Sequence, residues 1–161
     1  AVVEDSGTFA GNARKKAWAL HRVLPEGSCV LADDSGLSVE FLGGAPGVES
    51  AYYAGPAGDS GANLTKLVAA MQGVPAERRR AHFTCVLVLI DADACEHLFE
   101  GTCEGRLLDA PQGGAGFGYD PLFVPDGQAH SFAQLSDVAK NGLSHRARAW
   151  AKFAAWLRSI E

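Results

Sequence analysis

The sequence predicts an α/β fold in which helices flank a sheet. Stretches with the apolar stripe of a helix alternate along the 161-residue chain with short strand-like stretches, and residues 83–90 are apolar on both faces. Such a strand needs a layer of helices on each side of its sheet. No linker, repeat or low-complexity segment divides the chain, which indicates a single domain over residues 1–161.

Thr8 predicts the start of the first helix, because it can cap residues 9–22, which carry an apolar stripe and several basic side chains. Residues 29–32 then predict a short buried strand that stops at the turn-forming group 33–36. We expect residues 37–41 to resume as a strand before a glycine-rich break.

The rest of the chain predicts a helix over residues 63–71, a central strand over 83–90 and a neighbouring strand over 98–103. A glycine-rich loop over 111–118 and a short extended stretch over 122–124 follow. The clearest helix is the last, which begins after Ser144 as cap and carries apolar residues at intervals of three and four.

Composition excludes several other classes of protein. Hydrophobic residues make up 47% and charged residues 20% of the chain, which argues against disorder. The longest apolar run, residues 85–90, is too short to span a bilayer. The net charge of −5 disfavours a general nucleic-acid coat. We therefore expect a soluble, cytoplasmic domain with neither nucleic-acid polymers nor membranes as partners.

The four cysteines contain no CxxC pair. A zinc site could recruit Cys95, His97 and Cys103, but their spacing matches no common zinc knuckle. Buried free thiols in a reducing compartment are the favoured interpretation.

Asp33 and Asp34 form the first candidate site, because Asp33-Asp34-Ser35-Gly36 places two carboxylates and a hydroxyl between two predicted strands. Adjacent carboxylates repel unless a divalent cation or a cationic side chain lies between them. The alternative is an Asp-rich turn whose side chains cap its own backbone.

A second candidate follows the glycine-rich loop, where Phe117, Gly118, Tyr119 and Asp120 combine two aromatic rings with an acid. An aromatic ring can stack on a nucleobase, and a carboxylate can accept hydrogen bonds from its N–H groups. The alternative is a turn whose aromatic side chains return to the core.

Basic residues complete the candidate set. His145 and Arg146 open the last helix, where a cation is unfavourable unless a ligand compensates, although a surface His-Arg pair is the common alternative. Lys16 and Lys140 are either solvated lysines or groups that, with Asp34 and a metal, neutralise a triphosphate.

The stretch Gly58-Asp59-Ser60-Gly61 copies the core of the chymotrypsin-type nucleophile motif, for which His21 or His82 could serve as base. We disfavour serine hydrolysis, because the chain is rich in helices and Ser60 lies at the start of one.

Taken together, these segments resemble the inosine triphosphate pyrophosphatase family, the Ham1/RdgB-type enzymes. Several motifs occur in the family's order, and they extend almost from end to end. The matching residues are Thr8-Phe9, Asn12-Ala13, Lys16-Ala17, Leu31-Ala32-Asp33-Asp34-Ser35-Gly36-Leu37, Gly43-Gly44-Ala45-Pro46-Gly47-Val48, Ser50-Ala51, Tyr53-Ala54-Gly55, Asn63-Leu64, Lys66-Leu67, Phe83, Gly101, Gly105, Phe117-Gly118-Tyr119-Asp120-Pro121, Phe123 and Ser144-His145-Arg146-Ala147.

The resemblance implies Mg²⁺-dependent hydrolysis of the non-standard purine nucleotides ITP, dITP and XTP to the monophosphate and pyrophosphate, which sanitises the nucleotide pool. It implies a homodimer of elongated, two-lobed α/β subunits, each with a mixed twisted sheet flanked by helices.

The resemblance also implies roles for single residues. Asp34 is expected to be the catalytic carboxylate and a metal ligand, with Asp33 and Lys16 in the same catalytic set. Glu4 or Asp5 is the expected second acidic contributor to the metal. Ser35 and Lys16 are expected to touch the phosphates. The expected base pocket consists of Phe117, Gly118, Tyr119, Asp120, Lys140, His145 and Arg146. Donors such as Arg146 and His145 suit a 6-oxo purine, whereas the 6-amino group of adenine would leave them unpaired.

The chain departs from the family's pattern in two ways. Residues 1–7 hold no counterpart of the family's first strand and phosphate-binding lysine loop, so we expect the domain to be incomplete before Ala1. Four positions also carry residues unusual for the family: Gly11, Tyr52, His82 and Gln134.

Three functions remain open from the sequence. An active pyrophosphatase predicts Mg²⁺-dependent release of pyrophosphate from ITP or XTP. A catalytically impaired binding or scaffold protein predicts nucleotide binding without turnover. A third possibility is hydrolysis of a modified pyrimidine nucleotide.

Overall fold

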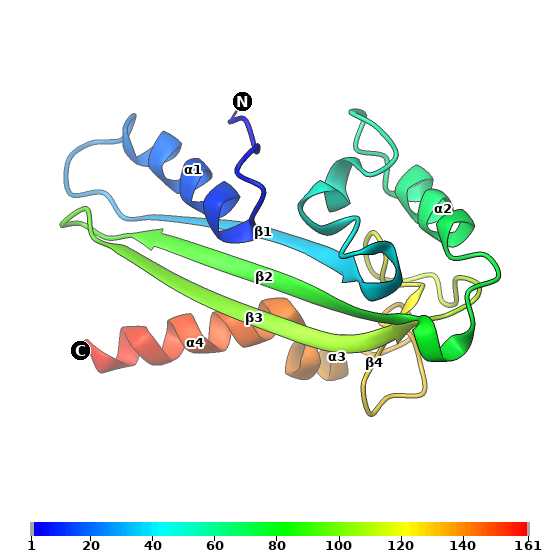
Figure 1. The fold of residues 1–161 in the computed structure, drawn as a ribbon. Helices are drawn as coiled ribbons and strands as arrows, with labels where there is room; N and C mark the ends of the chain where they lie inside the picture. The colour runs from blue at the N-terminus through cyan, green and yellow to red at the C-terminus, as the bar shows by residue number, and fades with distance from the viewer. Residues whose placement is uncertain (1, 161) are drawn as a thin grey trace. The chain divides into compact units, whose positions relative to one another are not determined.

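The computed structural model describes residues 2–160, so Ala1 and Glu161 lie outside the described residues. The helices and strands follow the order α1 (Phe9–His21), β1 (Val30–Val39), α2 (Ser60–Ala70), β2 (Arg80–Ile90), β3 (Glu96–Leu107), β4 (Phe123–Pro125), α3 (Asp137–Leu143) and α4 (His145–Ser159) (Figure 1). Short 3-10 helices occupy Glu40–Leu42, Gly47–Tyr52 and Ala76–Arg78.

The chain forms two compact units. The first unit contains the described residues up to Ser35, Thr84–Thr102 and the described residues from His145 onward. The second unit contains Gly36–Phe83 and Cys103–Ser144. The expectation of a single domain stays a prediction.

The described strands form one sheet in the order β1-β2-β3-β4. The strand directions alternate from β1 to β3 (Figure 1), and β3 pairs with β4 in antiparallel fashion, with Leu107 opposite Phe123. The predicted α/β class is confirmed, and the pairing of the described strands is antiparallel where the resemblance implied a mixed sheet.

In the first unit, helices cover both faces of β2. Residues Val86, Val88 and Ile90 pack against α1, whereas Cys85, Leu87 and Leu89 pack against α4. Successive side chains of a strand point to opposite faces, so an apolar strand buries both of them. The predicted central strand is therefore confirmed, and α1 and α4 lie on its two sides (Figure 1).

The close approach of α4 to β3 depends on a glycine. Gly101 is buried, and a Cβ atom added there would collide with the backbone of His145 and Ala149. The absence of a side chain at residue 101 thus lets the first turn of α4 lie directly on the strand.

The core of the second unit combines aliphatic side chains with aromatic rings. Phe83, Phe123 and Phe132 contact one another, with ring centroids 4.8–6.0 Å apart. Leu67 and Met71 of α2 and its C-cap are completely or almost completely buried against this core.

A buried arginine ties together loops of the second unit. Arg79 is 5% exposed, and it donates hydrogen bonds to the carbonyl oxygens of Met71, Val74 and Leu108 at 2.7–2.9 Å. It also forms an ion pair with the exposed Asp109. Because it satisfies several carbonyl groups at once, Arg79 fixes the end of α2 relative to the chain that follows β3.

The turn predicted at residues 33–36 is wrong, because these residues lie inside the continuous strand β1. Asp and Gly favour turns locally, but Val30 is buried near one end of the strand and Leu37 and Val39 near the other. Burial of these side chains and pairing with β2 outweigh the local preference. Residues 40–41 leave the strand and enter a 3-10 helix.

Helix α3 has no counterpart in the prediction. It has seven residues, too few to show a periodic apolar stripe, and the side chain of Ser136 caps it by accepting a hydrogen bond from the Ala139 amide. Ser144 ends this helix and directly precedes α4.

The remaining predictions concern side chains outside the main candidate site. Cys85 and Cys103 are buried as predicted, whereas Cys29 and Cys95 are exposed. Across residues 2–160, no three His, Cys, Asp or Glu side chains converge to hold a metal, and His97 pairs with Asp91 at 2.7 Å.

Asp59 and Ser60 have a structural role at the start of α2. Asp59 caps the helix by accepting a hydrogen bond from the Ala62 amide, and Ser60 is its first residue. The nucleophile-like motif is thus a helix start, as the disfavouring of serine hydrolysis implied. None of the described helices is long and apolar enough to cross a membrane.

Candidate active site

Three charged residues of the first unit meet at Lys16, and we call them the Lys16 cluster. The Nζ atom of Lys16, on α1, donates to Oδ1 of Asp34 on β1 at 2.8 Å and to Oε2 of Glu4 at 3.3 Å. Glu4 comes from the segment that precedes α1. The Asp34 side chain is 10% exposed, whereas those of Lys16 and Glu4 are 27% and 32% exposed.

Burial and charge act against each other in this cluster. Burial raises the pKa of the Asp34 carboxyl, although Lys16 and the Asn12 side chain favour its charged form. Burial also opposes the charge on Lys16, but Asp34 and Glu4 outweigh this effect and raise the lysine pKa. Two carboxylates thus face one ammonium group, an arrangement that attracts further positive charge.

Asp33 and Asp34 point to opposite faces of the sheet. Asp34 contacts Lys16 on α1, whereas Oδ2 of Asp33 accepts a hydrogen bond from Arg146 at the start of α4, at 3.2 Å. Neighbouring residues of a strand alternate in this way. The idea that one cation lies between the two adjacent carboxylates is therefore wrong. Asp33 contacts the last helix. Ser35 lies two residues further along β1 and therefore points to the same face of the sheet as Asp33.

Of the two acids expected beside Asp34, the structure brings Glu4 to it. Asp5 instead forms an ion pair with Lys15, and its side chain is 63% exposed. Glu4 shares the Lys16 ammonium with Asp34, so these two carboxylates are the ones within reach of a common cation.

The Lys16 cluster fits a magnesium ion that also binds phosphate. The second carboxylate oxygen of Asp34, Oδ2, is buried and has no hydrogen-bond partner. Mg²⁺ prefers oxygen ligands and commonly uses one or two carboxylates, together with water and substrate phosphates, rather than a complete protein cage. Asp34 and Glu4 supply such a set.

The second unit holds an exposed aromatic ring beside a buried acid. Asp120 is 6% exposed, accepts a hydrogen bond from the Phe117 amide at 2.8 Å and forms an ion pair with Lys140. The Phe117 side chain is 81% exposed, so its ring is available for stacking. Gly118 between them has a φ of +59°, which favours glycine and turns the loop.

Tyr119 follows the structural alternative. Its ring is buried in the core of the second unit, and its hydroxyl donates to the carbonyl oxygen of Ser50 at 2.7 Å. Desolvation raises the pKa of this phenol, so it stays protonated as a donor. The expected base-binding role of Tyr119 is thereby reduced to anchoring the loop that carries Phe117.

The predicted site residues fall into two groups. Those of the first unit are Glu4, Asp5, Lys16, Asp33, Asp34, Ser35, His145 and Arg146, and those of the second unit are Phe117, Gly118, Tyr119, Asp120 and Lys140. Of the residues predicted to be catalytic, Asp34 and Lys16 are in contact, whereas Asp33 lies on the other face of β1 and contacts Arg146. The full base pocket drew on both units and stays a prediction.

Asn12, for which the sequence predicted no role, is completely buried beside the Lys16 cluster. The signal was present, because Asn12 belongs to the stretch that matches the family and lies four residues, about one helical turn, before Lys16. A polar side chain on the buried face of an amphipathic helix is the feature that could have identified it.

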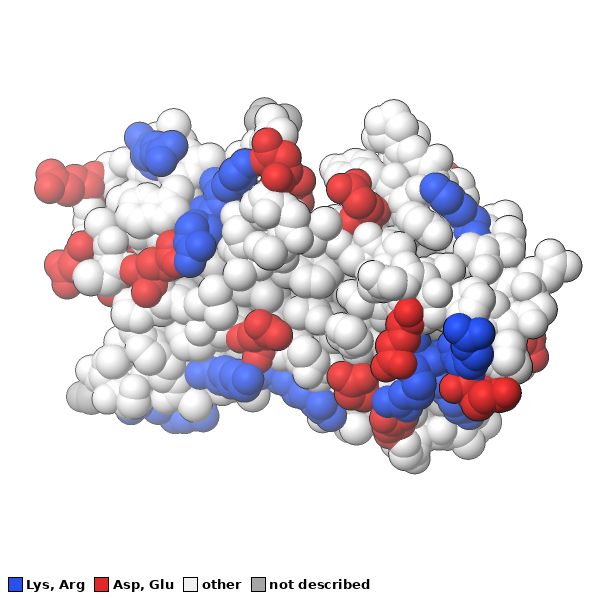
Figure 2. Space-filling model, viewed as in Figure 1, with Lys and Arg blue, Asp and Glu red and all other residues white. Residues whose placement is uncertain are grey.

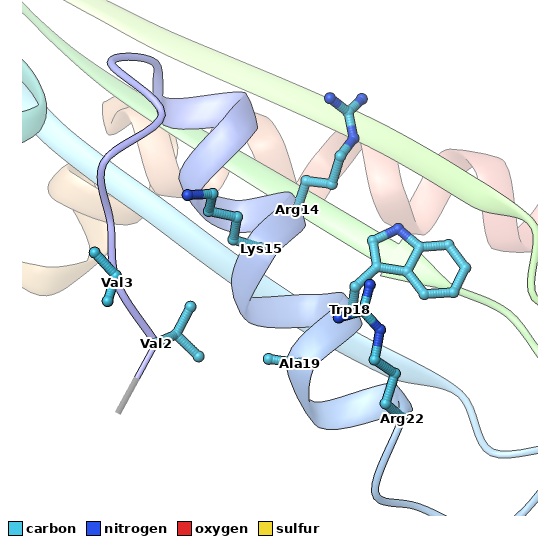
Figure 3. A pocket seen from close by; sticks show the side chains of 7 residues that line it. All are labelled: Val2, Val3, Arg14, Lys15, Trp18, Ala19 and Arg22. Atoms are coloured by element: carbon cyan, nitrogen blue, oxygen red, sulfur yellow. The ribbon is translucent and has the colours of Figure 1, made fainter.

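Two hollows open on the first unit. One, of about 490 Å³, is lined by Val2, Val3, Arg14, Lys15, Trp18, Ala19 and Arg22 (Figure 3). Glu96 neutralises Arg14 there, and Asp5 neutralises Lys15. The other, of about 320 Å³, is lined by Leu31, Ala32, Asp33, Leu87, Arg146 and Trp150. The Asp33–Arg146 pair therefore borders an open space.

Charges of both signs are interspersed on the face seen in Figure 2, where Lys and Arg side chains lie next to Asp and Glu. Among the described residues, Arg14 pairs with Glu96 and Arg80 pairs with Asp126, each through two hydrogen bonds or more. The described residues of this face thus form mixed-charge groups rather than one continuous basic surface.

Comparison with known proteins gives a consistent result. The model of the Ham1 family matches residues 1–156. A dITP/XTP pyrophosphatase of Opitutus terrae is 60% identical over 157 residues, which cover 98% of this chain and 77% of that protein. A dITP/XTP pyrophosphatase of Shouchella clausii is 46% identical over 148 residues, covering 92% of this chain and 74% of that protein.

A solved structure supports the fold. The Ham1 protein of Staphylococcus aureus superimposes with a TM-score of 0.93 at 38% identity, over 100% of this chain and 82% of that one. The resemblance inferred from the motifs is confirmed.

Proposed function

Because this chain belongs to the Ham1 family, we propose that it hydrolyses non-standard purine nucleoside triphosphates, namely dITP, XTP and ITP, to the monophosphate and pyrophosphate. Its relatives are named dITP/XTP pyrophosphatases. The observation that carries the proposal is the Lys16 cluster, in which a buried carboxylate, a second carboxylate and a lysine meet within 3.3 Å.

Asp34 is the proposed base for the attacking water. Lys16 occupies Oδ1, so Oδ2 is the oxygen that accepts the proton. Burial raises the pKa of this carboxyl, which makes it a better proton acceptor than a solvated aspartate while it is ionised. The proton lost by water thus moves to Asp34 as the oxygen attacks phosphorus and pyrophosphate leaves.

Lys16 and Glu4 are proposed to help neutralise the triphosphate, Lys16 by direct contact and Glu4 as a metal ligand. The raised pKa of Lys16 keeps its ammonium group positive. This group can exchange a carboxylate partner for a phosphate oxygen of the substrate. Asp34 and Glu4 are the proposed ligands of Mg²⁺, which would supply positive charge to the phosphates when bound.

Base recognition is proposed for an exposed aromatic ring and for the charged side chains predicted to form the base pocket. Phe117 offers an exposed ring, and Arg146 is a half-exposed guanidinium whose interaction with Asp33 leaves further donors. His145 and the Asp120–Lys140 pair are the other proposed contributors. We also propose a cytoplasmic homodimer, on the basis of the family resemblance alone.

The test is release of pyrophosphate from dITP, XTP, dATP and dGTP with and without Mg²⁺. We expect turnover of dITP and XTP, and we expect Asp34→Asn to lower kcat at least about 100-fold, the usual range for loss of a general base. Asp93→Asn, at an exposed aspartate in the turn between β2 and β3, is the matched control and should retain full activity. Nucleotide binding without turnover by the unaltered protein would refute the proposal.

A further inference from the structure

Asn12 lies between the segment that carries Glu4 and the Asp34 carboxylate. Its side chain is completely buried, and its Oδ1 accepts hydrogen bonds from the Ser6 amide at 3.2 Å and from the Ser6 hydroxyl at 2.8 Å. Because both groups of Ser6 are donors, the atom that they contact must be the oxygen of the Asn12 amide. The nitrogen, Nδ2, is therefore directed away from Ser6.

The other end of this amide is a donor that lacks an acceptor. Asn12 Nδ2 and Asp34 Oδ2 are both buried without a partner within hydrogen-bond distance. The Asn12 side chain nevertheless lies close enough to favour the charged form of Asp34. A buried donor and a buried acceptor that both lack partners are each costly, and a small movement that joins them removes both costs.

Gly11 gives Ser6 the room to reach Asn12. A Cβ atom at residue 11 would lie 2.6 Å from Ser6 Cβ and 2.9 Å from Thr8 Oγ1, both closer than real contacts allow. The contact between Ser6 and Asn12 therefore depends on the glycine at residue 11.

We propose that Asn12 is a positioning residue that donates from Nδ2 to Oδ2 of Asp34 and, through Ser6, holds the Glu4 segment beside the same carboxylate. One lone pair of Oδ2 then remains for a cation or for the proton of water, while Oδ1 keeps its hydrogen bond from Lys16. Carboxylates that bind metals are commonly oriented by such neighbours. The catalytic consequence rests on the proposed function, but the contact itself does not.

The contact can be tested without nucleotide or metal. In ¹⁵N-labelled protein, the Asn12 side-chain amide resonances are assigned by their loss in Asn12→Ser. We expect Asp34→Asn to shift them, because the acceptor changes, while the amide resonances of Asn63 stay in place. Asn63 is a buried asparagine of the second unit that bonds to backbone groups near residues 50–54. Asn12 resonances that do not move in Asp34→Asn would overturn the proposal.

The consequence for the site is measured with Mn²⁺ as the probe, by its electron paramagnetic resonance signal in nucleotide-free protein. We expect Asn12→Ser to weaken Mn²⁺ binding about 10- to 100-fold, and kcat to fall by a similar factor with little change in KM. Asn63→Ser should leave both values within about 2-fold for the folded fraction. Asn12→Ser with unchanged Mn²⁺ affinity and kcat would refute the positioning role.

A second variant guards against misfolding. Ser6→Ala removes the hydroxyl bond to Asn12 at a partly buried position and should give a smaller change in the same direction. If it has no effect while Asn12→Ser does not fold, the positioning role is refuted. A wild-type protein that does not hydrolyse dITP would refute the proposed function, whereas the amide resonances would still decide the role of Asn12.

Discussion

Replacing Gly101 with alanine should strongly destabilise the protein. Gly101 lies on β3 where the first turn of α4 crosses the strand, and a new Cβ atom would meet the His145 oxygen and the Ala149 nitrogen. Both distances would be under 2.5 Å, at least 0.9 Å inside the 3.4 Å at which ordinary contact begins. The colliding atoms belong to the helix backbone, so no side-chain rotation can relieve the overlap.

The cost follows from this geometry. Overpacking a well-packed interior typically costs about 1–3 kcal/mol, and the upper end applies where a whole helix must retreat. For a chain of this length, about 3 kcal/mol lowers Tm by roughly 6–12 °C. Because His145 and Arg146 open the displaced helix, we expect the Asp33–Arg146 contact to weaken as well.

Urea unfolding followed by circular dichroism measures the effect, with Gly142→Ala as the matched control. Gly142 lies in α3, and a Cβ atom added there would have no other atom within 4 Å, so alanine should add up to about 1 kcal/mol through helix propensity. Similar changes in stability for the two variants, or a Gly101→Ala variant as stable as wild type, would contradict this prediction.

Three further predictions concern single side chains. Arg79→Met should cost at least about 3 kcal/mol, because it leaves buried carbonyl groups without donors, whereas Asp109→Asn, at a side chain 90% exposed, should change the free energy of unfolding by less than about 0.5 kcal/mol; equal effects in urea would contradict this. Burial raises the pKa of Asp34, so the folded protein holds that proton more tightly than the unfolded chain, and this group's contribution to stability falls as pH rises above the usual aspartate range. Asp34→Asn should therefore stabilise the nucleotide-free protein at pH 7 but not below about pH 4, where both forms are neutral; a variant less stable than wild type at pH 7 would argue against it. Iodoacetamide should label Cys29 and Cys95 in the native protein and the two buried thiols only after unfolding, as mass spectrometry can show; complete labelling of the native protein would disprove this.

Features governed by local rules could be predicted from the sequence. Thr8 caps α1 as expected, because a threonine before an amphipathic stretch acts through its nearest neighbours: it accepts from the Gly11 amide at 3.0 Å. The strand over residues 83–90 was predictable because its side chains are apolar without regard to face. Both signals lie within a few residues of the element that they define.

Features that depend on distant contacts could not be predicted from these patterns. The turn preference of Asp33 and Gly36 is local, whereas the pairing and burial that override it come from β2 and both cores. The opposite directions of Asp33 and Asp34 follow from a strand but not from a turn. The wrong prediction of a turn at residues 33–36 therefore led to the wrong prediction of one cation between the two carboxylates. The choice of Glu4 over Asp5 depends on how the segment before α1 folds back, which its sequence does not encode by periodicity.

The alternation along β1 makes its register a determinant of the chemistry. A slip of β1 by one residue would exchange the faces of Asp33 and Asp34. Lys16 would then face Asp33, and Arg146 would face Asp34. The apolar residues Val30, Leu37 and Val39, buried toward the two ends of the strand, oppose such a slip because it would move each of them to the wrong face. Residues with no chemistry of their own thereby decide which of two identical side chains faces the candidate metal site.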